Sequence, residues 1–315
     1  MRNEANGGLV GVVYGGMDAT DFGKAIDLAT SFETQEERSR PFLMVSTGAF
    51  HNVTDIVFTR GVDMGIVQSD VLTTVKRDPP FPGIENYIQY ITKLYDEEVH
   101  ILTTKDITSI QELASKKVNF GIPDSGTHVT AEAIFGALFI DVQPTSFPQS
   151  VALDKLRRGE ISALVCLVSK PDRWFKTIRS EENLHFLSIP PIADLRERYT
   201  LATLSADDYP ELIDTGAPIS TVAVGNVLAV YNWAPRTERY RRVALFVSAF
   251  FDRLHDLGSP PYHPKWREVD VTAPIPGWRR FAAAQEWLRN AGLDTSSSIR
   301  NAGSDEGVTR REVRN

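Results

Sequence analysis

Residues 118–138, which read VNFGIPDSGTHVTAEAIFGAL, predict a strand, a tight turn and a helix in direct succession. The first five residues alternate and are β-prone, and the proline that comes soon after ends the predicted strand. Asp124, Ser125 and Thr127 are residue types that cap helices, and Gly126 between them carries no side chain. Apolar residues at helical spacing follow, so a helix is expected to begin at this turn.

The start of this predicted helix is a candidate site for an acid group. The first amides of a helix have no partner inside the helix, and the positive end of the helix dipole lies at the same place. Both features attract anions, so the turn favours a carboxylate held by Ser125, Gly126 and Thr127. The alternative interpretation of the same residues is an ordinary capped helix whose amides bind water.

Composition limits the possible functions. The chain has 315 residues, 42% of them hydrophobic, which is enough for a large core and favours two lobes. Lys and Arg number 34 against 41 Asp and Glu, a net charge of −7 without a basic run, which argues against nucleic acid as a partner. Cys166 is the single cysteine, so no intramolecular disulfide is expected, and its apolar segment predicts an inert core thiol.

The first part of the chain alternates between strands and helices. Strands are expected at residues 9–14, 41–46 and 62–67, and helices at residues 21–32, 50–60 and from 68 onward. This alternation predicts a parallel sheet with helices on both faces, in which a ligand lies beyond the carboxyl ends of the strands. The turns at those ends contain Gly16, Thr47, Gln68 and Ser69, which suit a binding rim and equally suit ordinary turns.

The second part repeats the alternation, which predicts a second α/β lobe. Strands are expected at residues 118–122, 142–147, 161–168 and 184–189, and helices after 126 and at 150–158 and 171–178. Two further strands, 99–104 and 223–231, would cross between the lobes. Long helical patterns follow at residues 238–257 and 277–290, and the polar chain from 292 onward is expected to be disordered.

The chemistry-bearing residues form no known catalytic or cofactor pattern. The six histidines show no HExxH or other metal-ligand spacing, and Gly15-Gly16 lacks the third glycine of a dinucleotide fingerprint. Asp124, Ser125 and His128 lie too close in the sequence to form a nucleophile, a base and an orienting acid. We therefore expect no metal, no cofactor and no enzymatic reaction.

Several stretches resemble the TAXI family, the solute receptors of one branch of TRAP transporters. The most specific is GIPDSGTHVTAEAI at residues 121–134, which is similar to that family's glycine, Ser-Gly-Thr turn and following helix. A second, GVDMGIVQSDVL at residues 61–72, is close to a family signature. With further similarity at residues 47–52, 153–163, 209–212 and 219–224, the resemblance covers most of residues 9–235 in order.

The resemblance implies a two-lobed type II periplasmic-binding-protein fold, with each lobe a mainly parallel sheet flanked by helices and with crossing hinge strands between them. Lobe I would comprise residues 1–103 and 222–291, lobe II residues 104–221, and residues 292–315 the tail. It also implies a periplasmic receptor, expected to be a monomer, that delivers a dicarboxylate, a 2-oxoacid or an acidic amino acid to membrane permease subunits. The ligand-binding positions would be Gly16, Asp18, Thr47, Asn52, Gln68, Ser69, Ser125, Gly126, Thr127 and Ser169.

The chain departs from the family directly after Gly16. The family continues with glycine, threonine and two aromatic residues, whereas this chain has MDAT at residues 17–20. Asp18 adds a negative charge at the rim, which would repel a dianion and suit an ammonium group. The first residues lack the apolar core of a secretory leader, so export is inferred from the resemblance.

Two alternative functions belong to other classes. The same fold could serve as a sensor domain that signals to a partner protein, for which a kinase or DNA-binding partner would be the discriminating observation. An enzyme on a similar two-lobed fold would be recognised by product formation from a bound substrate.

Overall fold

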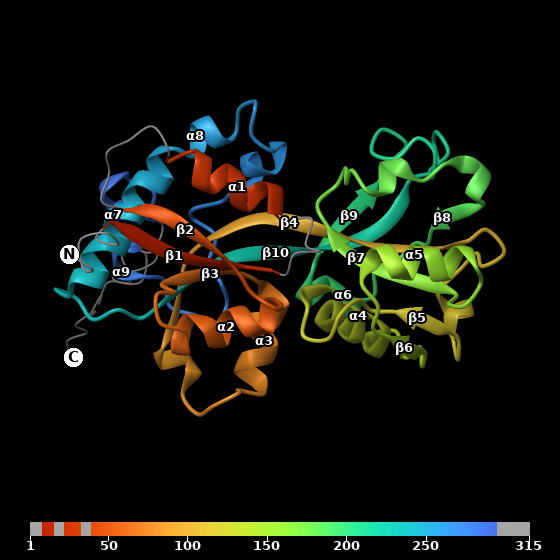
Figure 1. The fold of residues 1–315 in the computed structure, drawn as a ribbon, viewed down its shortest axis with the longest axis horizontal. Coiled ribbons are helices and arrows are strands. Elements are labelled where there is room, and N and C mark those ends of the chain that lie inside the picture. Colours follow the sequence, from red (N-terminus) through yellow and green to blue (C-terminus); the bar gives the residue numbers. More distant parts are fainter. Residues whose placement is uncertain (1–7, 16–21, 33–38, 295–315) are drawn as a thin grey trace, which may run out of the picture.

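The computed structural model describes residues 8–15, 22–32 and 39–294. Figure 1 shows two groups of strands and helices side by side, with strands β4 (Ile88–Thr104) and β10 (Ile219–Tyr231) running from one group into the other. The fold class predicted from the sequence, two α/β lobes joined by crossing strands, is therefore confirmed.

Lobe I is built on three parallel strands in the order β2-β1-β3, with β10 antiparallel beside β3. Its strands and first helices are β1 (Leu9–Tyr14), α1 (Phe22–Thr30), β2 (Arg40–Val45), α2 (Ala49–Phe58), β3 (Met64–Gln68) and α3 (Ser69–Arg77). Later segments return to this lobe as α7 (Glu238–Asp252), α8 (Leu254–Leu257) and α9 (Ala282–Asn290). Because successive side chains of a strand point to opposite faces, the sheet buries one core against α1 and α7 and another against α2 and α3.

Lobe II repeats this plan around β7, β5 and β6, which are parallel to one another. Its elements are β5 (Lys117–Asn119), α4 (Gly126–Ala137), β6 (Gln143–Thr145), α5 (Gln149–Arg157), β7 (Ala163–Val168), β8 (Leu184–Phe186), α6 (Ala193–Arg198) and β9 (Thr200–Leu204). Short 3-10 helices in the two lobes are η1 (Ile84–Asn86), η2 (Ile110–Leu113), η3 (Phe175–Thr177), η4 (Ser180–Glu182) and η5 (Pro264–Glu268). Cys166 is buried in β7, and burial raises the pKa of its thiol.

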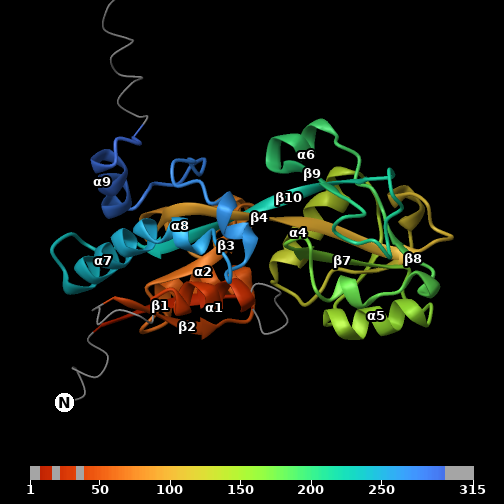
Figure 2. The same ribbon diagram turned by 90° about the horizontal axis from the view of Figure 1, so that it is seen from above.

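The crossing strands make the two lobe sheets continuous. β4 and β10 pair antiparallel from Ala223 opposite Glu98 to Tyr231 opposite Ile88, with irregular register near Gly225. Figure 2 shows both strands running lengthwise through the molecule. The sheet order β2-β1-β3-β10-β4-β7-β5-β6 follows, so any bending between the lobes acts on these two strands.

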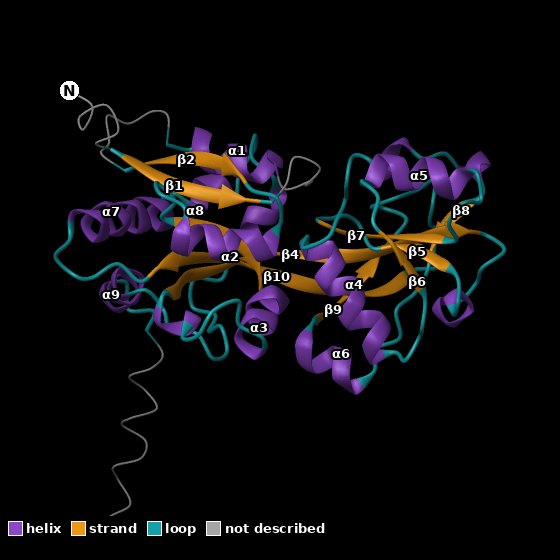
Figure 3. Ribbon diagram, turned by 60° about the horizontal axis from the view of Figure 1, so that its bottom comes forward, coloured by secondary structure: helices purple, strands orange, loops and turns teal. Residues whose placement is uncertain are grey.

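Helices of the two lobes meet beside the crossing strands. Figure 3 shows α3 of lobe I close to α4 and α6 of lobe II, and α3 and α4 are in contact. The first turns of α2 and α4 also approach each other, since the Phe50 amide donates to the carbonyl of Asp124 at 3.3 Å. The structure therefore has the lobes closed against each other.

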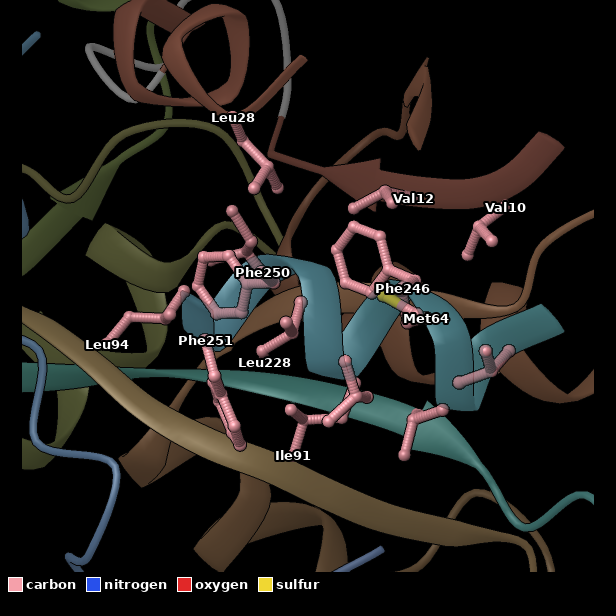
Figure 4. Close-up of a cluster of buried hydrophobic side chains, with 14 of the residues drawn as sticks. Val10, Val12, Leu28, Met64, Ile91, Leu94, Leu228, Phe246, Phe250 and Phe251 are labelled. Atoms are coloured by element: carbon pink, nitrogen blue, oxygen red, sulfur yellow. The ribbon is translucent and has the colours of Figure 1, made fainter. Parts of the chain in front are cut away.

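Aromatic residues of α7 fill the larger core of lobe I. In Figure 4, Phe246 and Phe250 lie between Val12 of β1 on one side and Leu228 of β10 and Ile91 of β4 on the other. All five side chains are fully buried. Burial of each contributes about 1.5–3 kcal/mol, so α7 holds the crossing strands firmly to lobe I.

The crossing strand β4 begins well before its predicted start. The sequence predicts a strand at residues 99–104, whereas β4 spans Ile88–Thr104. Charged residues inside the strand interrupt its apolar pattern. Two of them are buried beside lysines: Glu98 accepts from Lys265 at 2.6 Å, and Glu97 lies 3.7 Å from Lys24. Ion pairs with residues distant in the sequence thus allow these charged residues to lie in a strand that the local pattern does not predict.

The helix predicted at residues 171–178 is wrong, because only Phe175–Thr177 form a 3-10 turn there. The Asp172 carboxylate accepts from the amide of Trp174 at 2.9 Å, which stabilises a turn in place of a helix. The pattern at 238–257 is divided into α7 and α8.

Helix α9 begins later than the predicted residue 277. The amide of Phe281 donates to the carbonyl of Tyr90 on β4, and Arg280 forms a bridge with Tyr90, so this stretch is extended. Helix α6 and strand β9 have no counterpart in the sequence prediction. The predicted lobe boundaries remain a prediction, and residues 295–315 of the predicted tail lie outside the described residues.

Candidate functional site

A cavity of about 90 Å³ lies between the lobes. This is room for several water molecules, since one needs about 10–15 Å³. Lobe I and the crossing strand contribute Tyr14, Gly15, Gly48, Ala49, Asn52, Ile66, Gln68 and Glu97. Lobe II contributes Gly121, Ile122, Ser125, Gly126, Thr127, Pro148, Gln149, Leu167 and Val168. The ends of β1, β3 and β7 and the starts of α2, α4 and α5 therefore meet at one place.

The first turn of α4 has the geometry that its sequence predicts. Ser125 is the N-cap, and its hydroxyl accepts from the amide of His128 at 3.2 Å and donates to the carbonyl of Ile122 at 2.7 Å. The amides of Gly126 and Thr127 find no acceptor among the described residues. The Ser125 hydroxyl is thus engaged within the turn, and the two following amides remain as donors at the cavity.

The start of α2 faces α4 across the boundary between the lobes. A Cβ atom at Gly48 would lie 2.5 Å from the carbonyl oxygen of Asp124, so only glycine permits this approach. In the described part of the chain the amide of Ala49 also has no acceptor. Main-chain donors therefore come to the cavity from both lobes.

In the part of the chain that the structure describes, the side-chain oxygen of Asn52 is an acceptor without a donor. Asn52 is fully buried, and its Nδ2 donates to the carbonyl of Ile66 at 2.7 Å. A carbonyl oxygen can only accept, which fixes the orientation of the amide and leaves Oδ1 as the other atom. No donor among the described residues reaches this Oδ1. A buried acceptor without a donor costs about 1–3 kcal/mol, so the site is incomplete as it stands.

Gln68 lines the same cavity as Asn52 and the turn of α4. A Cβ atom at Gly126 would lie 2.6 Å from the Cδ of Gln68, so this glycine admits the side chain. The Oε1 of Gln68 is buried and has no partner in the described structure. Gln68 therefore touches the α4 turn directly across the boundary between the lobes.

One residue of the wall, Glu97, forms a buried ion pair with Lys24, which is not itself among the lining residues. Lys24 of α1 lies 3.7 Å from Glu97 Oε1, donates to Ser169 Oγ at 2.9 Å and lies 4.7 Å from the ring centre of Tyr95. Lys24 and Glu97 are each about 1% exposed, so their charges must balance each other. Ser169 follows β7, and its contact with Lys24 therefore joins the two lobes.

A second contact between the lobes lies at α3. The Asp70 carboxylate accepts from Thr130 of α4 at 2.6 Å and from Tyr199 at 3.2 Å. Burial of this carboxylate raises the pKa of Asp70, although both hydroxyls donate to it. Ser69 lies beside it, in a separate hollow of about 990 Å³.

The predicted ligand-binding residues fall into three groups. Asn52, Gln68, Ser125, Gly126 and Thr127 line the cavity. The other positions, Thr47, Ser69 and Ser169, are not part of its described lining, and Gly16 and Asp18 lie outside the described residues. The ligand-binding role of all ten positions stays a prediction.

Sequence reasoning missed several residues of the wall. Glu97 of the wall and the lysine paired with it, Lys24, are two of the missed residues, although a lysine within an apolar helical stripe and a glutamate within a crossing strand are unusual enough to signal a buried pair. Tyr14 and Gln149 give no local signal, because only the fold brings them to the cavity.

The described residues show no group of three or more His, Cys, Asp or Glu that could hold a metal ion. Within the same residues, no helix is both long and apolar enough to cross a membrane.

A profile of the NMT1-like family matches residues 15–273 of the 315. No curated protein matches the chain. Among solved structures, the alkanesulfonate-binding protein SsuA from Xanthomonas axonopodis pv. citri bound to MOPS is similar at 9% identity and a TM-score of 0.49, over 91% of this chain and 94% of that one.

Two further similar structures are a solute binding protein and a regulatory domain. A TctC solute binding protein from Polaromonas has 16% identity and a TM-score of 0.43, over 79% of this chain and 88% of that one. The CcmR regulatory domain of Synechocystis PCC6803 in complex with 2-PG has 14% identity and a TM-score of 0.46, over 81% and 99%. Values as low as these identify no ligand for this chain.

Proposed function

The chain belongs to the NMT1-like family, and from this premise we propose that it captures a small carboxylate-bearing solute reversibly between its lobes. It is a solute-binding or ligand-sensing domain of the two-lobed fold. Within that class we propose an extracytoplasmic receptor of a TAXI-type TRAP system, located in the periplasm, acting as a monomer and delivering its ligand to permease subunits. The resemblance at residues 121–134 and 61–72 supports this subtype.

One observation carries the proposal: the amides of Gly126 and Thr127, which have no acceptor in the described part of the chain, border a cavity enclosed by both lobes. They lie at the positive end of the α4 dipole, where a carboxylate is stabilised by charge and by two hydrogen bonds. The amide of Ala49 at the start of α2 adds a donor from the opposite lobe. An acid group held between these helix starts would contact both lobes at once.

Capture follows from contacts that exist only when the lobes are closed. A ligand shifts the equilibrium between open and closed forms only by its difference in affinity for the two. Binding to lobe II alone would give no such difference, whereas a carboxylate that touches both helix starts gains contacts on closure. The described wall offers no nucleophile with a paired base, so the proposal is binding and release without a reaction.

The test is calorimetry on wild type and Gly126→Val, with an organic acid selected by thermal shift. A ligand specific for the folded state raises the melting temperature, so this screen finds the acid to titrate. In Gly126→Val the new side chain meets Gln68 and blocks the carboxylate, so we expect affinity to fall at least about tenfold, or about 1.4 kcal/mol. Gly136→Val is the matched control, because that glycine is in the same helix and faces open space. Equal affinities of wild type and Gly126→Val would overturn the assignment of this turn.

A further inference from the structure

The cavity offers acceptors as well as donors. Asn52 Oδ1 is buried, its amide orientation is fixed by the bond to Ile66, and no described donor reaches it. A carboxylate cannot satisfy this atom, because an ionised acid has only acceptors. Gln68 is less decisive, since no hydrogen bond from the described residues fixes the orientation of its amide and it can turn either end toward a ligand.

The negative charge of Glu97 in the wall also favours a ligand that carries a hydrogen-bond donor. Glu97 lines the cavity, and the lysine that balances it, Lys24, is not among the lining residues. No Lys, Arg or His belongs to the described lining. One acid group can be held by the helix starts, but a second would face Glu97 and Asn52 Oδ1 with no cationic side chain in the described lining to offset it.

We propose that the ligand carries one carboxylate and, separately, an N–H donor, and that it is a small amino acid in place of a dicarboxylate or a 2-oxoacid. The carboxylate binds the amides of Gly126 and Thr127, and the ammonium group donates to Asn52 Oδ1 and Glu97. This inference rests on the proposed function and narrows its ligand class. The volume of about 90 Å³ requires a compact molecule.

The distinction is chemical and therefore simple to test. β-Alanine, propionate and succinate share one carboxylate on a two-carbon chain and differ in bearing an ammonium group, a hydrogen or a second carboxylate. Alanine and pyruvate differ in an ammonium group against a carbonyl. Only β-alanine and alanine can donate to Asn52 at neutral pH.

The experiment is a thermal-shift and calorimetric panel on the wild-type chain with these five acids, the common amino acids, glutarate and 2-oxoglutarate. We expect the amine-bearing member of each matched set to bind at least about tenfold more tightly than its partners. Succinate, glutarate or 2-oxoglutarate binding as well as or better than every amino acid would overturn this inference and leave the proposed function standing. If no acid in the panel binds, the carboxylate assignment fails as well.

Asn52→Leu then tests the residue itself. The advantage of an amino acid over its amine-free analogue should shrink in this variant, because the acceptor is gone while the α4 amides remain. Asn232→Leu is the matched control, since Asn232 also donates from Nδ2 to a main-chain carbonyl, that of Asn86, but does not line the cavity. An unchanged advantage in folded Asn52→Leu would overturn the role of Asn52. Should that variant fail to fold, the wild-type panel decides the ligand class alone.

Discussion

The two contacts between the lobes differ in whether their polar groups are satisfied. At α3 the Asp70 carboxylate receives hydrogen bonds from Thr130 and Tyr199, so the contact is complete within the protein. At the cavity, Asn52 Oδ1 and the amides of Gly126 and Thr127 have no partners among the described residues. The same closure thus satisfies the polar groups at one contact, whereas those at the other have no partner in the described part of the structure.

This difference supports the proposal that a ligand binds at the cavity. Buried polar groups in folded proteins nearly always have partners, so a local cluster without them calls for an explanation. Under the proposed function, the Asp70 contact is already complete in the closed form, and the cavity is the part of the interface that a ligand completes. The glycines at the cavity, Gly48 and Gly126, fit this view because each permits an approach that a Cβ atom would prevent.

The largest effect is expected from blocking closure at the cavity. In Gly48→Val, the new side chain would collide with the main chain of Asp124, which cannot move aside as a flexible side chain could. We expect affinity for the selected acid to fall about a hundredfold, or ~2.7 kcal/mol, by calorimetry. Small-angle scattering should show a larger radius of gyration in the presence of ligand than for wild type.

The control for this variant is Gly23→Val, a glycine of α1 with open space around it. It should leave affinity and ligand-dependent compaction unchanged. Wild-type affinity in Gly48→Val would show that binding does not depend on closure at this point, and the comparison between the two contacts would lose its basis.

A smaller effect is expected at the complete contact. Asp70→Ala removes the acceptor of Thr130 and Tyr199, and leaving such groups unpaired costs about 1–3 kcal/mol. Water reaches them once the lobes open, so the cost falls on the closed form and we expect about a tenfold loss of affinity. Tyr199→Phe removes one of the two hydrogen bonds and should lose less. A larger loss in Asp70→Ala than in Gly126→Val would contradict the assignment of the ligand to the cavity.

The pH dependence sharpens the role of Asp70. Burial raises the pKa of this carboxyl in the closed form, so the closed form binds its proton more tightly than an open form in which the group is hydrated. The contribution to closure is therefore fully present below the ordinary pKa of about 4 and is lost as pH rises through the raised pKa. Relative to Asp70→Asn, wild-type affinity should fall over that range, and parallel pH profiles would contradict this.

Local patterns were sufficient for many, but not all, of the regular elements of the two lobes. The strand at residues 9–14 follows from a short apolar run and the helix that starts at Gly126 from capping chemistry, and the structure has them as β1 and α4. The start of β4 was not predictable in this way, because Glu97 and Glu98 break the apolar pattern and are stabilised by lysines distant in the sequence. The helix prediction at residues 171–178 was wrong for a related reason. The amide of Trp174 donates to the Asp172 side chain and not to a main-chain carbonyl, as it would inside a helix.

The candidate site also contains features that local sequence predicts and features that only the fold creates. The α4 turn can be predicted from the sequence, because the capping residues, the glycine and the helix are contiguous at 124–138. The orphan acceptor of Asn52 could not be foreseen, since it depends on the carbonyl of Ile66 taking the other end of its amide. The pairing of Lys24 with Glu97 likewise arises from residues 73 positions apart that only the fold brings together.

The most direct test of the account is amide hydrogen exchange by NMR at Gly126 and Thr127, without and with the tightest-binding acid of the panel. If main-chain donors at the start of α4 hold the carboxylate, exchange at both amides slows on saturation, and by more in wild type than in Gly48→Val. Unchanged exchange at these two amides, under conditions in which calorimetry shows the acid to be bound, would contradict the central claim.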